Sequence, residues 1–271
     1  MRVRAGGSAA GARPRITLLT DFGTADGYVA AMRGVLATLA PDTPVDDASH
    51  AIGHGDIEAA AWCLLQYWDR YPVGGVHLVV VDPGVGGSRR PIAGEVAGRF
   101  FVAPDNGVLT HVLAANPSFE LVHIDASAVV LEPTSATFHG RDIFAPAAAR
   151  LATGTRLERL GTAINDPVAL NVAPARQERG VLHGEVVHVD RFGNLITNVP
   201  GDWLEGASDV IVSGRSVGRP RRHYGDAAAG ELVALIDSAG RLEIAVRDAS
   251  AAARLGTSRG APVTVRLGGG D

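Results

Sequence analysis

Apolar residues in the first part of the chain occur either in short continuous runs or in longer runs at helical spacing. The short runs lie at 16–20, 76–81 and 100–103. The runs at helical spacing lie at 27–39, 56–68, 107–115 and 143–152. Short apolar runs bounded by turn residues are typical of buried strands, and apolar residues three and four apart form one face of a helix. Their alternation predicts an α/β domain at 15–167, with a mostly parallel sheet and flanking helices.

Beyond residue 180 the apolar residues alternate with polar ones, as in strands that bury one face. The alternating runs lie at 184–190, 194–198, 208–213, 231–237, 241–246 and 262–267. Tight turns join the first run to the second and the fourth to the fifth, which predicts two hairpins. We therefore expect a smaller C-terminal all-β barrel domain at 181–268. A polar, turn-rich linker is predicted at 168–180, and a disordered tail rich in Arg, Gly and Ala at 1–14.

Composition narrows the possible function classes. The chain of 271 residues has a net charge of −4, which gives no reason to expect a nucleic-acid partner. No apolar stretch is long enough to span a bilayer, so no membrane partner is expected. The sequence has no lysine, which excludes Schiff-base and phosphate-loop lysines. The single cysteine, Cys63, lies in an apolar helical run and is predicted to be a buried, inert thiol, in keeping with a cytoplasmic protein.

Three of the predicted strands end in the same way, with an aspartate followed two residues later by a glycine. These aspartates are Asp21, Asp82 and Asp105. Ligands of open α/β sheets bind beyond the carboxyl ends of the strands, so the three carboxylates are expected to converge on one crevice. Like charges that gather in this way need a cation, a donor-rich ligand or a catalytic task. The alternative is that each aspartate caps a turn or the next helix.

The segment 82–90 is a glycine-rich loop that directly follows a strand. It resembles a phosphate-binding loop, but Arg89 stands where a dinucleotide-binding loop has its third glycine, and no lysine follows. The loop instead supplies two neighbouring arginines, Arg89 and Arg90. Either of them, within reach of Asp82, would hold that carboxylate in its ionised form. The sequence does not decide which arginine does so.

A second group of polar residues precedes the last predicted helix of the α/β domain. His139 is a natural proton carrier near neutral pH, and Asp142 is placed to cap the helix. The alternative is a turn histidine held by one hydrogen bond, and His54 has the same ambiguity. The aspartates and His139 could also form a binuclear metal centre, but no closely spaced pair of ligands in the sequence supports a metal site.

A tight turn in the predicted barrel carries a third group. Asp190, Phe192 and Asn194 offer a face for a planar base and polar groups for an amine or amide. The same residues are also typical of a hairpin turn in which Asp and Asn bond their own backbone. The residues alone leave both interpretations open.

Taken together, six stretches resemble one family, the S-adenosyl-L-methionine (SAM) hydrolases, also called SAM hydroxide adenosyltransferases, which are related to the fluorinases and chlorinases. The stretches are Leu18-Leu-Thr-Asp-Phe-Gly23, Val80-Val-Asp-Pro-Gly-Val-Gly86 with Arg89-Arg90, Pro104-Asp-Asn-Gly107, Thr137-Phe-His-Gly-Arg-Asp-Ile-Phe-Ala-Pro146, Val189-Asp-Arg-Phe-Gly-Asn-Leu-Ile-Thr-Asn198 and Leu242-Glu-Ile-Ala-Val246. They occur in the family's order and extend over nearly the whole chain.

The resemblance implies an N-terminal α/β domain, a C-terminal β-barrel and a homotrimer in which SAM lies between the N-domain of one subunit and the C-domain of its neighbour. It implies the reaction of SAM with water to give adenosine and methionine, with SAM as substrate and no metal or other cofactor. The family's catalytic Asp, Arg and His fall on Asp82, Arg89 and His139.

The resemblance also implies contacts with the substrate. It places Asp21 on the ribose hydroxyls, Ser238 at the methionine end and the backbone near Val246 at the adenine. The further positions expected to bind substrate are Asp105, Asn106, Asp190, Phe192 and Asn194. Two departures concern the pocket walls: Gly55 stands where the family usually has an aromatic residue, and 247–250 replaces an Asn-Gly-rich stretch.

Two alternative functions stay open. The related halogenases carry Tyr where Asp82 stands and a small residue where His139 stands. A carboxylate there would repel a halide, so these two residues favour water as the nucleophile. The chain could also bind SAM or adenosine as a sensor without turnover.

Overall fold

The computed structural model describes residues 14–129 and 135–268, and it divides the chain into two compact units. One unit extends to Leu170, and the other begins at Asn171. The predicted disordered tail, 1–14, lies outside the described residues except for Pro14.

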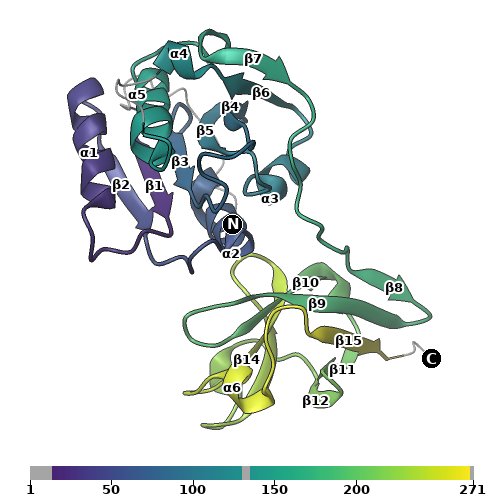
Figure 1. Ribbon diagram of the computed structural model, residues 1–271. Helices are drawn as coiled ribbons and strands as arrows, with labels where there is room; N and C mark the ends of the chain where they lie inside the picture. The colour runs from purple at the N-terminus through teal and green to yellow at the C-terminus, as the bar shows by residue number, and fades with distance from the viewer. Residues whose placement is uncertain (1–13, 130–134, 269–271) are drawn as a thin grey trace. The chain divides into compact units, whose positions relative to one another are not determined.

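The first unit is built on a seven-stranded sheet with the strand order β2-β1-β3-β5-β4-β6-β7 (Figure 1). Its strands are β1 (Ile16–Thr20), β2 (Val45–Ser49), β3 (Val76–Val80), β4 (Pro91–Val96), β5 (Arg99–Pro104), β6 (Phe119–Ile124) and β7 (Gly161–Ile164). Strands β2, β1, β3 and β5 run parallel to one another. Strand β4 pairs antiparallel with β5 and β6, and β7 pairs antiparallel with β6. The sheet is therefore mixed, with an antiparallel half beside the predicted parallel strands.

Helices cover both faces of this sheet. They are α1 (Tyr28–Leu39), α2 (Ile57–Tyr67), α3 (Thr110–Ala114), α4 (Ala126–Val129) and α5 (Ala145–Ala152), with 3-10 turns at Trp68–Arg70 and Leu157–Arg159. α1 and α5 pack against the face that carries Leu78 and Val80 of β3. α2 and α3 cover the other face, which carries Val79 and Val81. Because successive side chains of a strand point to opposite faces, a strand covered on both sides is apolar throughout.

The hairpin of β4 and β5 was not expected from the sequence. Ala97 and Gly98 form its two-residue turn, with φ angles of 49° and 74°. These angles make it a type I′ turn, which needs positive φ at both central residues, a conformation that Gly adopts readily and Ala adopts rarely. Ala-Gly is therefore a weak turn signal, and the pairing of β4 with β5 was missed for this reason.

The three predicted aspartates lie at one edge of the sheet. Asp21, Asp82 and Asp105 follow β1, β3 and β5, which are neighbours in the strand order. These three strands are parallel, so their carboxyl ends meet at the same edge. The three strand ends are therefore neighbours, as predicted, whereas the convergence of the three carboxylates on one crevice stays a prediction.

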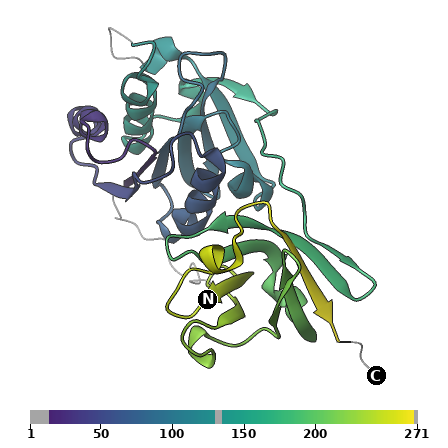
Figure 2. The ribbon, with the colours of Figure 1, turned by 60° about the horizontal axis from the view of Figure 1, so that its bottom comes forward.

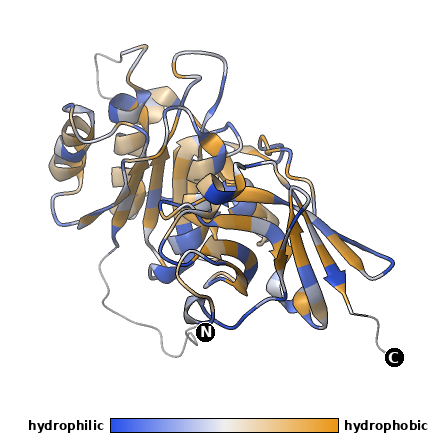
Figure 3. Cartoon of the chain, turned by 90° about the horizontal axis from the view of Figure 1, so that it is seen from below, coloured by the Kyte–Doolittle hydropathy of each residue, from blue (hydrophilic) through white to orange (hydrophobic). Residues whose placement is uncertain are grey.

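The second unit is a nearly closed antiparallel barrel with the strand order β12-β11-β15-β9-β10-β14-β13, seen from another side in Figure 2. Its strands are β9 (Val181–Val189), β10 (Leu195–Pro200), β11 (Ala207–Val212), β12 (Arg215–Gly218), β13 (Leu232–Ile236), β14 (Arg241–Val246) and β15 (Pro262–Leu267). The end strands β12 and β13 approach each other. Apolar and polar residues alternate along the strands (Figure 3), and the buried apolar residues form a main core and a smaller separate cluster of Ala227, Val233, Leu235 and Ala245.

The two predicted hairpins of this unit are β9–β10 and β13–β14. A short strand, β8 (Arg176–Glu178), pairs with β9 and lies within 168–180, the segment predicted to be a linker. One helix, α6 (Ala251–Leu255), and 3-10 turns at Gly201–Leu204 and Tyr224–Asp226 complete the unit. Over the described ranges, the chain contains no helix that is long and apolar enough to cross a membrane.

Candidate active site

An ion pair between Asp82 and Arg89 joins the two ends of the glycine-rich loop. Nε of Arg89 donates to Oδ1 and Oδ2 of Asp82 at 2.9 and 3.0 Å, and Nη2 donates to Oδ2 as well. The side chains of Asp82 and Arg89 are only 5% and 10% exposed. A buried arginine that donates from two nitrogens to one carboxylate fixes the orientation of both groups.

The same arginine contacts His139. Nη2 of Arg89 lies 2.8 Å from Nδ1 of the imidazole ring. A guanidinium group has donors and no acceptor, so Nδ1 must accept this hydrogen bond and cannot carry a proton. His139 is therefore the neutral tautomer with its proton on Nε2. Asp82, Arg89 and His139 form one hydrogen-bonded chain.

The surroundings of His139 favour the neutral ring. Burial lowers the pKa of His139 below its ordinary value, and the positive charge of Arg89 lowers it further. The charges of Asp82 and Asp142 raise it by less. The guanidinium of Arg89 also lies over the ring of Phe144, 5.2 Å from its centroid. A lowered pKa leaves His139 uncharged near pH 7.

Glycines allow the two loops of this group to approach each other. Gly86 has a φ of +75°, and a Cβ added there would lie 2.4 Å from the backbone oxygen of Ala136. A Cβ added at Gly84 would lie 3.1 Å from Cγ of Arg89. The glycine-rich sequence of the loop is thus explained by close packing against the segment that carries His139.

The neighbouring arginine has different partners. Nε of Arg90 donates to Oδ2 of Asp105 at 2.8 Å, and Nη1 donates to Oδ1 of Asp166 at 2.9 Å. The backbone N–H of Val168 donates to Oδ1 of Asp105 at 2.8 Å. The structure therefore assigns Arg89 to Asp82 and Arg90 to Asp105. The Arg90 pair ties the segment 166–168 to the end of β5.

Asp105 and Asn106 thus make structural contacts in this chain. The side chain of Asp105 is 2% exposed, and both of its oxygens accept hydrogen bonds from the protein. Nδ2 of Asn106 donates to the backbone oxygen of Val81 at 2.9 Å. The substrate contacts expected of Asp105 and Asn106 stay predictions.

The prediction that Asp142 caps a helix is wrong. Asp142 lies inside a π-helical turn, Gly140–Phe144, which leads into α5. Its Oδ2 accepts a hydrogen bond from the backbone N–H of Ser135 at 2.7 Å, and its carboxylate pairs with Arg141. Because the helical turn starts after His139 and already includes Asp142, the carboxylate bonds to the preceding segment instead of the first turn.

Asp21 is held in a separate way at the end of β1. Its Oδ2 accepts a hydrogen bond from the backbone N–H of Gly55 at 2.8 Å and lies 3.6 Å from Nδ1 of His54, which is exposed. Gly55 has a φ of +68°, and a Cβ there would lie 3.5 Å from Cβ of Pro83. Gly55 therefore bonds the Asp21 carboxylate and lies near the start of the loop that begins at Asp82.

An aromatic cluster joins the neighbours of Asp21 and His139. The ring centroids of Phe22 and Phe138 are 6.0 Å apart, and Tyr28 lies 5.8 and 5.4 Å from them. Phe22 directly follows Asp21, and Phe138 directly precedes His139. Packing of these rings couples the two loops. The cluster could not be predicted from the sequence, since aromatic contacts between distant loops leave no local pattern.

Three of the residues predicted in the barrel, Asp190, Phe192 and Asn194, lie at the β9–β10 turn. Oδ1 of Asp190 accepts hydrogen bonds from the backbone N–H groups of Phe192 and Asn194, both at 2.9 Å. Oδ2 of Asp190 accepts one from Nδ2 of Asn194 at 3.1 Å. The turn thus bonds its own backbone, as one of the two interpretations expected, and it leaves the Phe192 side chain 76% exposed.

A hollow of about 660 Å³ lies beside this turn. Its lining includes Phe192, Asn194 and Val246 of the predicted set, together with Tyr224 and the segment 247–250. Ser238 belongs to the β13–β14 turn and is not part of this lining. Tyr224 was missed because the segment before β13 has no apolar periodicity that could mark it.

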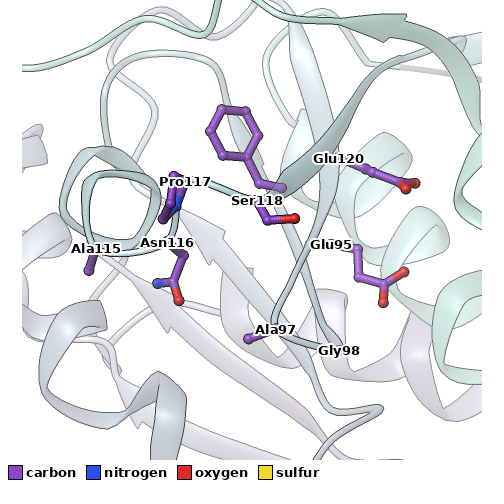
Figure 4. A pocket seen from close by; sticks show the side chains of 9 residues that line it. Glu95, Ala97, Gly98, Ala115, Asn116, Pro117, Ser118 and Glu120 are labelled. Carbon is purple, nitrogen blue, oxygen red and sulfur yellow. The ribbon is translucent and has the colours of Figure 1, made fainter.

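A second hollow, in the first unit, lies away from the group of Asp82, Arg89 and His139. It has a volume of about 440 Å³ and lies at the β4–β5 turn, at the end of β4 away from Arg90 (Figure 4). Glu95 and Glu120 lie at its edge, directly opposite each other in the pairing of β4 with β6. Within 14–129 and 135–268, no three His, Cys, Asp or Glu side chains are grouped so that they could hold a metal ion.

Comparison with known proteins links this arrangement to one family. The profile for the SAM hydroxide adenosyltransferase N-terminal domain matches residues 16–161, and that for the SAM hydroxide adenosyltransferase C-terminal domain matches residues 184–264. Proteins named (R)-S-adenosyl-L-methionine hydrolase from Salinispora tropica and Thermus thermophilus are 41% and 40% identical, over 94% and 92% of this chain and 98% of each relative. A fluorinase from an Actinoplanes species is 28% identical over 73% of this chain and 76% of its own.

Solved structures agree with the fold. The crystal structure of an uncharacterized conserved protein from Thermotoga maritima matches with a TM-score of 0.87 and 35% identity, over 93% of this chain and 99% of that chain. The crystal structure of a conserved hypothetical protein from Thermus thermophilus matches with a TM-score of 0.77 and 38% identity, over the same shares.

Proposed function

The chain belongs to the SAM hydroxide adenosyltransferase family, and from that premise we propose that Asp82, Arg89 and His139 are the residues with which it activates water against SAM. The protein is a SAM hydrolase. Relatives that match almost the whole chain carry the name of this activity. The observation that carries the proposed mechanism is the hydrogen-bonded chain from Asp82 through Arg89 to His139.

The reaction depends on the nucleophile more than on the leaving group. The oxygen of water forms a bond to C5′ of the ribose while the bond from C5′ to the sulfonium breaks. The sulfur keeps the electron pair and leaves as the neutral thioether of methionine. Water loses one proton, so SAM and water give adenosine, methionine and a proton. The site must therefore orient the water and accept its proton.

The direction of the hydrogen bonds indicates which residue orients the water and which one accepts its proton. The Nε2–H of neutral His139 donates to the oxygen of the water and orients it. His139 does not take the proton, because a proton on Nδ1 would face the donor group of Arg89. The carboxylate of Asp82 accepts the proton, since its oxygens have lone pairs beyond those that Arg89 occupies. These steps use only the substrate and residues of the chain.

The substrate contacts follow the division of polar groups between the two units. Carboxylates suit a cationic sulfonium and the ribose hydroxyls, and Asp21 is the carboxylate assigned to the hydroxyls. Phe192, Asn194 and Val246 line the hollow of the barrel, which offers an aromatic face and an amide to the adenosyl part. Ser238 is assigned to the methionine end, and Asp190 is a further position expected to contact SAM.

Halogenation is the competing chemistry, and the charge at the site disfavours it. The carboxylate of Asp82 repels an anion that approaches C5′. The hydrolases are also the nearer relatives, at 41% identity against 28% for the fluorinase. The other alternative is that the protein binds SAM without converting it, and an assay has to distinguish this from hydrolysis.

Incubation with SAM in oxygen-18 water tests the proposed function. We expect adenosine that carries the label on its 5′-oxygen, because the nucleophile is water, together with an equal amount of methionine. Chromatography with mass spectrometry measures both products, and added chloride is the control. Unlabelled adenosine, 5′-chloroadenosine as the main product, or SAM that is bound but unchanged would each refute the hydrolysis.

The two neighbouring arginines give a matched pair of variants. Arg89→Met breaks the chain to Asp82 and His139, and we expect kcat/KM to fall on the order of 10²-fold or more. Arg90→Met removes a hydrogen bond from the partly exposed Arg90 to the buried Asp105 carboxylate, so the free energy of unfolding should fall by about 2 kcal/mol with little effect on kcat/KM. Steady-state kinetics and thermal denaturation separate the two effects. Equal loss of kcat/KM in both variants would contradict the assignment of Arg89.

We further propose that the enzyme is a homotrimer in which a neighbouring subunit completes each site. The support is that the site residues are divided between two units, with Asp21, Asp82 and His139 in one and Asp190 and Asn194 in the other. Cyclic contacts of the head-to-tail kind bring different surfaces of two subunits together and close a ring.

Mixing two inactive variants tests the shared site. Asp82→Asn damages the half-site of the first unit, and Asn194→Ala damages that of the second. We expect co-expressed mixed trimers to recover part of the activity, because some sites then combine two intact halves. Trimers of each variant alone are the controls. Verified mixed oligomers without activity, or an active monomer in solution, would contradict the proposal.

A further inference from the structure

A hydrogen bond beside the hollow of the barrel has no place in the mechanism described above. The phenol of Tyr224 donates to Oε1 of Glu243 at 2.6 Å. Tyr224 lines the hollow, whereas Glu243 lies on β14 and is only 4% exposed. Neither residue has an assigned task. Burial of a carboxylate costs free energy unless hydrogen bonds compensate for the water that it loses.

Glu243 lies at a rigid position. It pairs with Ile196 of β10 on one side and with Leu235 of β13 on the other, so its backbone is held within the sheet. Burial raises the pKa of Glu243, the hydrogen bond from Tyr224 lowers it by less, and the charges of Asp190 and Asp237 raise it further. A strand that is paired on both sides is a precise platform for an acceptor, since its backbone has little freedom to move.

Tyr224 lies in a less regular part of the barrel. It begins the 3-10 turn Tyr224–Asp226 between β12 and β13. The carboxylate of Asp226 accepts hydrogen bonds from the backbone N–H groups of Arg222 and His223, at 3.1 and 3.2 Å, and so holds the backbone of this turn. The side chain is 46% exposed, so packing alone leaves much of the ring surface open.

The ring therefore depends on its hydroxyl for a fixed direction. A half-exposed tyrosine has several rotamers within reach, and a hydrogen bond to a buried acceptor selects one of them. The selected ring lines the same hollow as Phe192 and Asn194. Two exposed aromatic side chains in one hollow form a suitable wall for a planar group.

We propose that Glu243 is a positioning residue that holds the Tyr224 ring as a wall of the substrate hollow, where it contacts the planar part of SAM. The inference rests on the proposed function, because it names SAM as the occupant. It assigns no chemistry to Glu243, which acts on the substrate only through Tyr224. Its effect should therefore appear in substrate affinity and leave the chemical step unchanged.

Three single variants and one double variant test the pair. Tyr224→Phe keeps the ring and removes the hydroxyl, and Glu243→Leu removes the acceptor. We expect each of them to raise KM for SAM roughly 3–10-fold with kcat within about twofold of wild type, the range expected when one hydrogen bond is lost. Glu243→Gln keeps an acceptor oxygen and should have a KM close to that of the wild type. The double variant Tyr224→Phe/Glu243→Leu should be no worse than the worse single one, because both remove the same contact.

A change in KM without a change in kcat distinguishes a positioning role from a purely structural one. If the variants lower the melting temperature while KM stays at the wild-type value, the inference is overturned. Fully additive effects in the double variant would overturn it as well. If Glu243→Leu fails to fold, the KM values of the two single variants Tyr224→Phe and Glu243→Gln are sufficient to test the inference.

The same variants keep the two proposals apart. A wild-type protein that releases no adenosine from SAM would refute the proposed function, and calorimetric SAM binding would then test the inference. Weaker binding in Tyr224→Phe, with Glu243→Gln unchanged, supports the positioning role. Equal affinity in all the variants contradicts it.

Discussion

A guanidinium group can donate hydrogen bonds and cannot accept them, and the chemistry of this site follows from that constraint. Arg89 lies between Asp82 and His139 and donates to both. The imidazole must therefore accept at Nδ1 and keep its proton on Nε2. One arginine thus fixes the orientation of a carboxylate and the tautomer of His139, and in the proposed mechanism it leaves Nε2–H to donate to the water.

The fold contributes by bringing the two loops close enough for this arginine to reach both partners. Gly86 lets the loop after β3 approach the backbone of Ala136, where a Cβ would lie 2.4 Å from an oxygen. Phe144 lies beneath the guanidinium. The next arginine, Arg90, has a structural task instead, since it pairs with Asp105 and ties down the segment 166–168. Neighbouring residues of one type therefore have separate partners: Arg89 belongs to the proposed catalytic group and Arg90 to a structural contact.

The sequence predicted the parts of this structure that have local signals. Apolar runs that end at Asp21, Asp82 and Asp105 identified three neighbouring parallel strands, and the period of two identified the strands of the barrel. The hairpin of β4 and β5 was missed because Ala97 is an unusual residue for a position with positive φ. The partners of Arg89 and Arg90, the contacts of Asp142 and the bond from Tyr224 to Glu243 depend on tertiary packing, which no local pattern encodes.

The protonation state of His139 is the most direct test of the account. Nitrogen-15 NMR of the protein labelled at histidine distinguishes the two tautomers and the charged ring, and a His139→Gln variant assigns the signal. At pH 7 we expect a neutral ring with a protonated Nε2 and an unprotonated Nδ1. We also expect the ring to change tautomer or charge in Arg89→Met. A proton on Nδ1 of the wild-type enzyme, or a charged imidazolium at pH 7, would contradict the arrangement on which the mechanism rests.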